Sequence, residues 1–367
     1  MNDQLDFYNK NKINPVEIKS DKKFFNLHHH QRRNLYENHL KIPMSWFQNK
    51  DFLEFGPNSG DNALITCMWG GNGILVEPHS FVHTQIQQLF EKYRLEHNLQ
   101  EIYSETLEIF ESNRTFDLVI AEGFLHAISN RIEMLMKLFR FSHDKVIITY
   151  SNCYGFFFES LKRFVFRKAI QMKNIDEKNW SLLLDLAEDI FRNAFEKLKT
   201  ARTFESWVKD VLLNPCITSE SLNDLPDFLE KLPPNWKYYS GSPAWDLSFL
   251  YCWYKDIKEE NIMEYYLQSI PFFITGKRED SFSSIEVAKI KSLTELMLDF
   301  SSNINQVEDR ISASDLTVFQ QKSLIDVKNL FWSFQTSNID YTLDFYKDSC
   351  ISDFWGMPHH YVCFSLR

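Results

Sequence analysis

Residues 51–61 read DFLEFGPNSGD, and this stretch decides the fold. The apolar residues 52–55 are typical of a buried strand, the Gly-Pro-Asn-Ser-Gly at 56–60 predicts a tight turn, and the pattern of residues 62–69 predicts a helix. A strand, a turn and a helix in this order predict the first unit of a doubly wound α/β sheet, whose turn offers backbone N–H groups to a nucleotide-like ligand. Glu54 lies inside the strand, where a buried carboxylate requires a partner.

Further apolar runs alternate with helical patterns along the chain. Strands are expected at 74–76, 102–103, 116–121, 145–149, 236–239 and 361–366, and helices at 81–96 and 131–141. Residues 241–243, Gly-Ser-Pro, are expected to form the turn after the sixth strand. We therefore expect an α/β fold with a doubly wound, mostly parallel, seven-stranded Rossmann-like sheet.

Two long helical stretches interrupt this alternation and are expected to be α-helical cap insertions. Helices are expected at 180–200, 284–300 and 314–334, the last two with a capping-type serine at the start. Inserted after the fifth and sixth strands, they would cover the ligand edge of the sheet; the alternatives are a dimer interface or a separate module. The expected segments are an N-terminal helical segment (1–49), a cofactor-binding core (50–151), a first insertion (152–235), a returning strand and turn (236–255), a second insertion (256–355) and the last strand (356–367).

The composition restricts the class of partner and the compartment. The 367 residues carry a net charge of −10, which argues against nucleic acid as the main partner. The six cysteines are scattered without a CxxC pair and favour reduced thiols. No signal-peptide apolar region and no apolar run of about 18 residues is present, so we expect a cytoplasmic protein without membrane insertion.

Three histidines and two arginines lie close together in the N-terminal segment. His28, His29 and His30 are consecutive, so on a helix they point in different directions and do not bind one metal ion together. We therefore expect no metal site here. Arg32 and Arg33 either meet an anionic substrate or face water, and water is the preferred interpretation.

The residues of the first turn narrow the choice of ligand. A dinucleotide site requires G-x-G-x-x-G, but this chain has Asn58 and Asp61 at the second and third glycine positions. An acid at a helix start repels a pyrophosphate but not a sulfonium. Glu77 lies about 20 residues beyond the turn, where a carboxylate accepts hydrogen bonds from a ribose diol. A cationic ligand also suits the acids at or near the strand ends: Glu54, Asp61, Glu77, Glu105 and Glu122.

Three runs, LEFGPNSGDNAL at 53–64, LVEP at 75–78 and FDLVIAEGFLHAI at 116–128, resemble class I S-adenosylmethionine-dependent methyltransferases. The resemblance covers roughly residues 45–150, and Asn58 replaces the middle glycine of the family's E-x-G-x-G-x-G. Later pieces resemble a bacterial subgroup with helical insertions: 204–208, Asp210, 213–215, 242–243 and 253–255.

The resemblance implies S-adenosyl-L-methionine as cofactor and S-adenosyl-L-homocysteine as product. It implies that the methionine part lies against the first turn, at Glu54, Gly56, Asn58 and Gly60. It places the ribose at the second strand, at Glu77 and Pro78, and the adenine after the third, at Glu105 or Thr106. The sulfonium and the acceptor would lie at the fourth strand, at Glu122, Gly123 and Phe124.

The identity of the methyl acceptor is the property that the sequence determines least. We expect a small-molecule or sugar acceptor, with protein or lipid methylation in an open groove, or a non-catalytic module, as alternatives. If the acceptor is a hydroxyl, His126 is the first candidate for a general base and Glu122 the second catalytic candidate, with His359 and His360 weaker. The candidate substrate wall consists of Tyr36, Tyr154 and Trp245. A homodimer is a further expectation.

Overall fold

The computed structural model describes residues 7, 10, 22–125, 128, 130–198, 200, 202–245, 259–277, 281–300, 303–311 and 316–367. The chain forms two compact units. The sheet unit comprises residues 1–150, 223–266 and 360–367, and the helical unit comprises residues 151–222 and 267–359.

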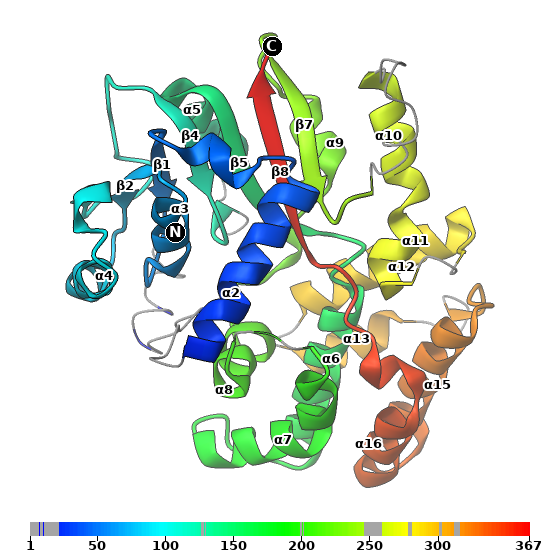
Figure 1. Ribbon diagram of the computed structural model, residues 1–367. Helices are drawn as coiled ribbons and strands as arrows, with labels where there is room; N and C mark the ends of the chain where they lie inside the picture. The colour runs from blue at the N-terminus through cyan, green and yellow to red at the C-terminus, as the bar shows by residue number, and fades with distance from the viewer. Residues whose placement is uncertain are drawn as a thin grey trace. The chain divides into compact units, whose positions relative to one another are not determined.

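The described strands form one mostly parallel sheet (Figure 1). Its order is β3-β2-β1-β4-β5-β8-β7, and the short strand β6 pairs with β5. The pairs among β1 to β5 are parallel, whereas β7 and β8 are antiparallel. The expected doubly wound α/β sheet is therefore confirmed. The strands are β1 Asp51–Phe55, β2 Asn72–Val76, β3 Leu99–Tyr103, β4 Phe116–Ala121, β5 Ser142–Asn152, β6 Leu222–Asn223, β7 Trp236–Ser242 and β8 His359–Leu366.

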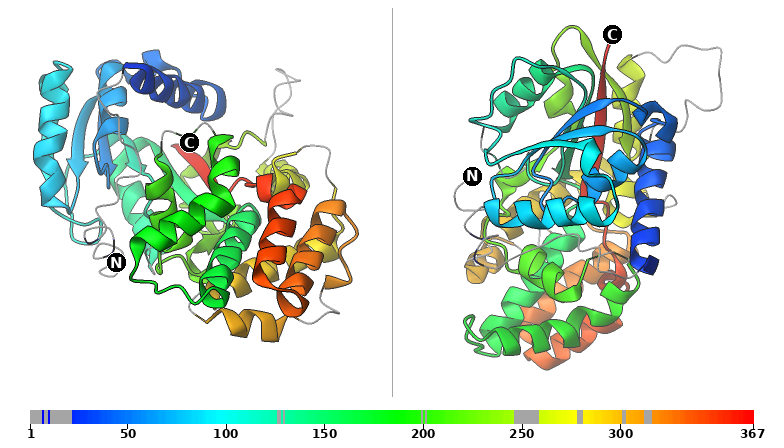
Figure 2. Two further views of the ribbon diagram at one scale, coloured as in Figure 1. Left: turned by 90° about the horizontal axis from the view of Figure 1, so that it is seen from below. Right: turned by 60° about the vertical axis from the view of Figure 1, so that its left-hand side comes forward.

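Helices connect the parallel strands and cover the sheet (Figure 2). Helix α2 belongs to the N-terminal segment, and α3 begins directly after the first turn. The helices of the sheet unit are α2 Lys22–Asn34, η1 Leu35–His39, η2 Met44–Phe47, α3 Asp61–Met68, α4 Ser80–Lys92, η3 Glu96–Asn98, α5 Arg131–Phe141 and α9 Leu225–Leu229; α10, Glu259–Gln268, ends at the unit boundary.

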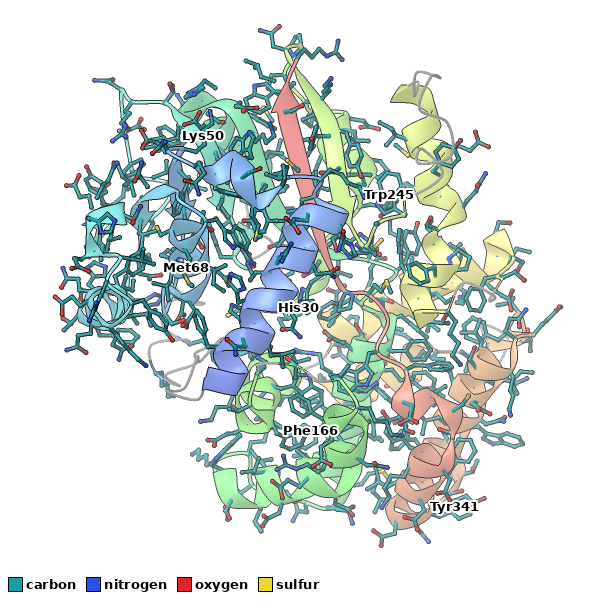
Figure 3. The ribbon with its side chains drawn as sticks, viewed as in Figure 1. His30, Lys50, Met68, Phe166, Trp245 and Tyr341 are labelled. Carbon is teal, nitrogen blue, oxygen red and sulfur yellow. The ribbon has the colours of Figure 1, made fainter. Side chains whose placement is uncertain are left out.

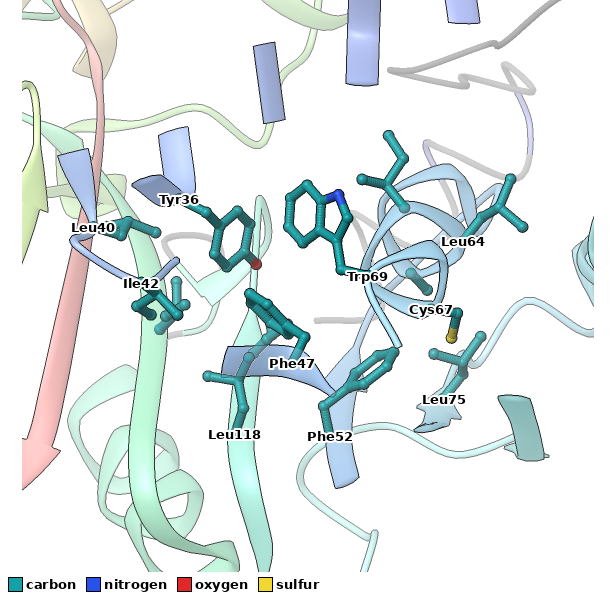
Figure 4. Packing of buried hydrophobic residues seen from close by; sticks show 14 of the residues in the cluster. Tyr36, Leu40, Ile42, Phe47, Phe52, Leu64, Cys67, Trp69, Leu75 and Leu118 are labelled. Atoms are coloured by element: carbon teal, nitrogen blue, oxygen red, sulfur yellow. The ribbon is translucent and has the colours of Figure 1, made fainter. Parts of the chain in front are cut away.

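Aromatic rings fill much of the core on the face of the sheet that α3 and α4 cover. Tyr36 lies edge-on to Phe47 and Trp69, with ring centroids 5.3 and 5.2 Å away (Figure 4). Phe52 and Leu118 belong to the same buried cluster and come from β1 and β4. Burying each large apolar side chain contributes roughly 1.5–3 kcal/mol. The high aromatic content thus serves the core, and it fixes the N-terminal segment against the sheet.

The helical unit is built around α6, Phe157–Met172, which is buried on nearly all sides. It packs against η5, α11, α12, α13 and α16. Four of its buried residues carry formal charges, so this helix combines an apolar core position with internal ion pairs. The other helices of this unit are α7 Trp180–Glu196, α8 Phe204–Trp207, η5 Val208–Leu212, η6 Ser219–Ser221, α11 Ile270–Thr275, α12 Ser284–Asp299, α13 Ile304–Arg310, α15 Lys322–Thr336, α16 Ile339–Asp348 and η8 Cys350–Asp353.

Two local expectations were wrong. The expected helix at 314–334 is interrupted: residues 312–315 lie outside the described part, residues 317–321 are not helical, and α15 begins at Lys322, because the backbone N–H of Gln320 bonds to Glu286, at 2.9 Å, instead of joining a helix. The turn expected at Gly241-Ser242 is strand, because both residues pair with β8. The serine cap expected for α12 is present, since Ser283 and Glu286 form a capping box.

Candidate functional site

The turn after β1 is shaped by three residues with left-handed backbone conformations. Gly56, Asn58 and Gly60 have φ angles of 66°, 49° and 78°. Glycine adopts this region without the steric cost that a Cβ atom adds. The ring of Phe124, from the loop after β4, lies against Gly56, where a Cβ atom would stand 3.0 Å from it. The turn and the loop after β4 are therefore neighbours.

Glu77, directly after β2, is buried and forms a hydrogen bond to the turn after β1. One carboxylate oxygen accepts the backbone N–H of Asn58 at 2.8 Å. The other lies 2.9 Å from the backbone N and 2.6 Å from the Nδ1 atom of His79. Within the described part of the chain, the Nε2 atom of His79 is buried and has no hydrogen-bond partner. Glu77 thus connects two candidate contact groups, the turn backbone and the His79 ring.

Glu54 lies at the end of β1 with 2% of its surface exposed. The pKa of its carboxyl is raised to about 8, mainly by burial and also by the charge of Glu122, while Arg32 opposes the rise. The expected direct partner is missing for one oxygen: Oε2 is buried without a hydrogen bond to any described residue. The side chain relieves its buried charge by protonation, a usual outcome for an isolated carboxylate in a low-dielectric site.

Glu122 follows β4 and is held from three elements through one oxygen. Its Oε1 atom accepts bonds from Arg32 of α2 at 2.6 Å, Tyr361 of β8 at 2.5 Å and Asn62 of α3 at 3.3 Å. Its Oε2 atom is buried, and none of the described residues bonds to it. Half of this carboxylate is therefore fixed and the other half is open to a donor.

Arg32 corrects the expectation that it faces water. It is 5% exposed, and although burial disfavours its charge, Glu122 and Tyr36 hold its pKa well above the usual value. Arg33, its neighbour, is exposed and pairs with Glu37 at 2.8 Å. The difference arises because α2 turns its inner face toward the sheet, so that Arg32 shares that face with residues four positions away in each direction.

The histidines of α2 have separate surroundings. His28 is buried, bonds to Asn62 at 3.0 Å, and has a pKa lowered to about 4 by burial and by Arg32. His29 lies 3.1 Å from the Nε1 atom of Trp69. His30 is exposed (Figure 3). Among the described residues, no group of three or more His, Cys, Asp or Glu side chains has metal-site geometry, and no helix is long and apolar enough to cross a membrane.

The remaining predicted residues belong to different elements of the two units. Glu105 and Thr106 lie half-buried on the loop after β3, and the exposed Gly123 donates its N–H to Thr149 at 2.6 Å. Tyr36 is buried beside Arg32. The His126 position lies outside the described residues. The other candidates are elsewhere: Trp245 packs on Tyr238 and Tyr266, His360 lies against Tyr150, and Tyr154 and His359 belong to the helical unit.

Arg32, Asn62, His79 and Tyr361 were not predicted as site residues. A sequence signal exists only for Arg32, because His28, Arg32 and Tyr36 recur every four residues and so share one face of a helix. Asn62, His79 and Tyr361 have no comparable signal. Their role depends on which strands become neighbours.

Glu54, Glu122 and the first turn lie where the strand order reverses. β1 and β4 are adjacent, β2 and β3 lie to one side, and β5 lies to the other. In open α/β sheets this reversal opens a crevice at the carboxyl ends of the strands, and ligands bind there. Fold and geometry together define a doubly wound α/β protein with a candidate ligand site of buried carboxylates at the β1–β4 reversal.

No family model and no curated protein matches the chain. Solved structures that resemble part of it include the O-methyltransferase StiE (residues 961–1257), the magnesium protoporphyrin IX methyltransferase ChlM from Synechocystis PCC 6803, and an S-adenosylmethionine-dependent methyltransferase from Clostridium acetobutylicum ATCC 824. Their sequence identities are 12%, 11% and 15%, over 34%, 41% and 42% of this chain, with TM-scores of 0.30, 0.30 and 0.28. The matched regions cover 44%, 69% and 58% of those chains, so this chain spans less than half of the StiE fragment.

Proposed function

We propose that this protein is an S-adenosylmethionine-dependent methyltransferase that binds its cofactor at the carboxyl ends of β1, β2 and β4. The acceptor that we propose is a small molecule or a sugar, methylated on oxygen or nitrogen. The proposal rests on the residues of the first turn, on the sheet order and on the acids that the sheet brings together.

The observation that carries the proposal is the pair of buried carboxylates with unbonded oxygens. Glu54 and Glu122 stand at or next to the ends of adjacent parallel strands, and the charge of Glu122 contributes to the raised pKa of Glu54. Within the described residues, each has one buried oxygen without a hydrogen bond. Such a site repels an anionic dinucleotide and favours a ligand that brings positive charge. S-adenosylmethionine carries both an ammonium and a sulfonium.

Residues of the chain then have distinct tasks in holding the ligand. The turn Gly56–Gly60 is proposed to hold the methionine part, because its left-handed backbone at Gly56, Asn58 and Gly60 forms the tight turn that precedes α3. Glu77 and its partner His79 face the ribose hydroxyls as acceptors. Glu105 or Thr106 is proposed to meet the adenine, since both lie on the loop after β3.

When bound, the cofactor supplies an activated methyl group, and its transfer leaves S-adenosylhomocysteine. The task of the chain is to position the acceptor in line with that methyl group and to exclude water. Gly123 and Phe124 are proposed to border this space. An acceptor hydroxyl also needs a base for its proton; His126 stays the first candidate and the free oxygen of Glu122 the second.

Isothermal titration of the full chain with S-adenosylhomocysteine tests the proposal. We expect saturable binding of one ligand per chain. Absence of binding at millimolar ligand, with a folded protein by circular dichroism, would rule the cofactor out. Binding of S-adenosylhomocysteine with no methyl transfer to a panel of sugars and small hydroxyl or amine compounds would leave a cofactor-binding module instead of the proposed enzyme.

A further inference from the structure

We propose that the helical unit contains a binding site for the carboxylate of a small organic acid, formed by Lys162, Trp207 and Trp355 beside Glu159. We refer to these four residues as the anion cluster. They come from α6, from α8 and from the segment after η8, all of which belong to the helical unit. The inference is independent of the proposed function, because the residues proposed to hold the cofactor belong to the sheet unit.

The four side chains of the anion cluster border one small region of the helical unit. The ring centroids of Trp207 and Trp355 are 5.4 Å apart, and the Nζ atom of Lys162 lies 4.3 Å from the centroid of the Trp355 ring. Glu159 precedes Lys162 by three residues on α6, so the two side chains share one face of this helix, and their charges interact. Groups from three separate segments are therefore brought together (Figure 1).

The anion cluster has more hydrogen-bond donors than its described surroundings satisfy. The indole Nε1 atoms of Trp207 and Trp355 are buried and have no hydrogen-bond partner among the described residues. The ammonium of Lys162 has three N–H groups, but in the described part of the chain it bonds only to the carbonyl of Phe354. An indole N–H is a donor only, and a buried donor without a partner costs free energy. This set of donors requires a ligand that is rich in acceptors.

The nearby charges favour a ligand with one negative charge. Arg202 and Asp210 form an ion pair, so their charges cancel. Lys162, Arg163 and Glu159 are buried, and together they leave a surplus of one positive charge when all three are ionised. A carboxylate brings one negative charge and two acceptor oxygens, whereas a phosphate dianion exceeds the surplus. Burial raises the pKa of Glu159 to about 7, so near neutral pH it takes up a proton readily and does not repel the ligand.

The walls of the site are aromatic, which suits an organic acid better than a bare ion. The ring of Phe195 packs on Trp207 and Trp355, with centroids 5.5 and 6.5 Å away. Such surroundings have a low dielectric constant, in which a charge-assisted hydrogen bond is strong. Trp355 is half-buried, whereas Glu159, Lys162 and Trp207 are buried. We therefore expect the ligand to enter beside Trp355.

The indole N–H resonances of ¹⁵N-labelled protein test the inference with sodium acetate as the probe. The chain has nine tryptophans, and W207F and W355F assign the two relevant resonances while an aromatic ring is kept in place. Acetate should move both resonances of the wild-type protein saturably and with one Kd, because each N–H gains an acceptor. Resonances that stay in place at tens of millimolar acetate overturn the inference.

Trp180 is the internal control. Lys209 lies 4.8 Å from the centroid of its ring, and both side chains are partly exposed, so the same pair of groups is present without burial. Its resonance, assigned with W180F, should not move. Shifts at Trp180 as large as those at Trp207 and Trp355 overturn the inference, because they report a general effect of salt.

Substitutions in the anion cluster provide a second measurement. K162M keeps an apolar contact with Trp355 but removes the ammonium, so acetate should bind about tenfold to hundredfold more weakly, whereas K209M should keep the wild-type affinity. E159Q removes a charge that repels a carboxylate and should tighten binding. Unchanged affinity in K162M, or weaker binding in E159Q, contradicts the proposal; the wild-type titration decides even if K162M does not fold. Sodium chloride should move the two resonances less than acetate, and equal shifts with equal affinity overturn the assignment to a carboxylate.

Discussion

Some single residues of the candidate site are buried with unpaired polar atoms, which costs electrostatic free energy that a bound ligand is expected to reduce. Glu54 is the plainest case, because it is buried in a strand and one of its oxygens has no partner among the described residues. Positions of this kind lower stability and are retained where they serve binding or catalysis. The pH dependence of folding therefore reports on the site directly.

Glu54→Gln should flatten the stability profile between pH 6.5 and pH 8. The pKa of Glu54 rises from its usual 4.5 to about 8 on folding, so in this range the unfolded chain binds fewer protons and wild-type stability falls as pH rises. The full effect is about 1.4 kcal/mol for each pKa unit that separates the two states. Urea unfolding of both proteins at the two pH values measures it.

The range from pH 6.5 to pH 8 excludes the pH dependence of stability that His28 contributes, which has the opposite sign. Its pKa is lowered to about 4, so His28 makes stability rise with pH only between there and its usual 6.5. The two groups are thus separable. If the wild type and Glu54→Gln show the same loss of stability from pH 6.5 to pH 8, Glu54 is ionised in the folded protein and the description of the site is wrong.

Glu77→Ala should weaken S-adenosylhomocysteine binding about tenfold or more. The variant removes the acceptor that the ribose hydroxyls are proposed to meet and also frees the backbone N–H of Asn58. Titration calorimetry gives the affinity, and Glu101→Ala, an exposed acid on β3, is the control. An unchanged affinity with a reduced melting temperature shows that Glu77 only supports the turn.

How far the site is predictable from sequence differs from residue to residue. Glu54, Gly56 and Glu77 are marked by their position in one strand–turn–helix pattern, which is local. Arg32 reaches Glu122 across 90 residues of sequence. That contact depends on how α2 packs, which the sequence pattern does not specify, and so the preference for water at Arg32 was wrong.

At the scale of elements, the turn after β1 depends on a close approach that only glycine permits. Gly56 has a φ of 66°, and Phe124 fills the space where a Cβ atom would lie. The turn is therefore fixed both by its own backbone and by the loop after β4. A substitution at Gly56 disturbs the two strand ends at once.

Gly56→Ala should destabilise the protein by about 1–3 kcal/mol and weaken S-adenosylhomocysteine binding, because it adds backbone strain and a contact with Phe124. Gly276→Ala is the matched control, with φ 74° but no neighbouring atom within 4 Å of a Cβ. It should lose only the backbone contribution and no affinity. Thermal unfolding and calorimetry measure both. Equal effects of the two variants on stability and affinity would show that a steric contact with Phe124 contributes nothing to the effect of the Gly56 substitution.

In the helical unit, Arg163 of α6 holds the end of a second helix. It has no exposed surface, and its two terminal nitrogens donate to the carbonyls of Val211 and Asn214 at the end of η5. Burial lowers the pKa of its guanidinium to about 9. Val211 lies in η5 and Asn214 lies two residues beyond its end, where carbonyls lack the partner that a continuing helix provides, so a buried cation satisfies them.

Arg163→Met should therefore cost about 2–4 kcal/mol of stability, because it removes charge-assisted bonds and leaves buried carbonyls unpaired. Arg192→Met, on the exposed face of α7 beside Glu188, should change stability by less than about 0.5 kcal/mol. Guanidinium unfolding compares the pair. Similar small losses in both variants would show that water replaces the guanidinium of Arg163.

For the whole molecule, the sequence predicts the sheet better than the helical unit. The strand at 116–121 and the helix at 131–141 are found at the expected residues, because buried strands and amphipathic helices carry strong local patterns. The start of α15 was wrong because the bond between Gln320 and Glu286 is a tertiary contact. The strand order, and with it the meeting of Glu54 and Glu122, emerges only when the strands pair.

The central claim is that the β1–β4 reversal binds S-adenosylmethionine through buried carboxylates. A crystal structure of the full chain with S-adenosylhomocysteine tests it most directly. The account predicts the ribose hydroxyls beside Glu77 and His79, and the positively charged part of the ligand beside the buried oxygens of Glu54 and Glu122. Ligand density at another place in the chain, or a ligand whose ribose lies away from Glu77, would contradict it.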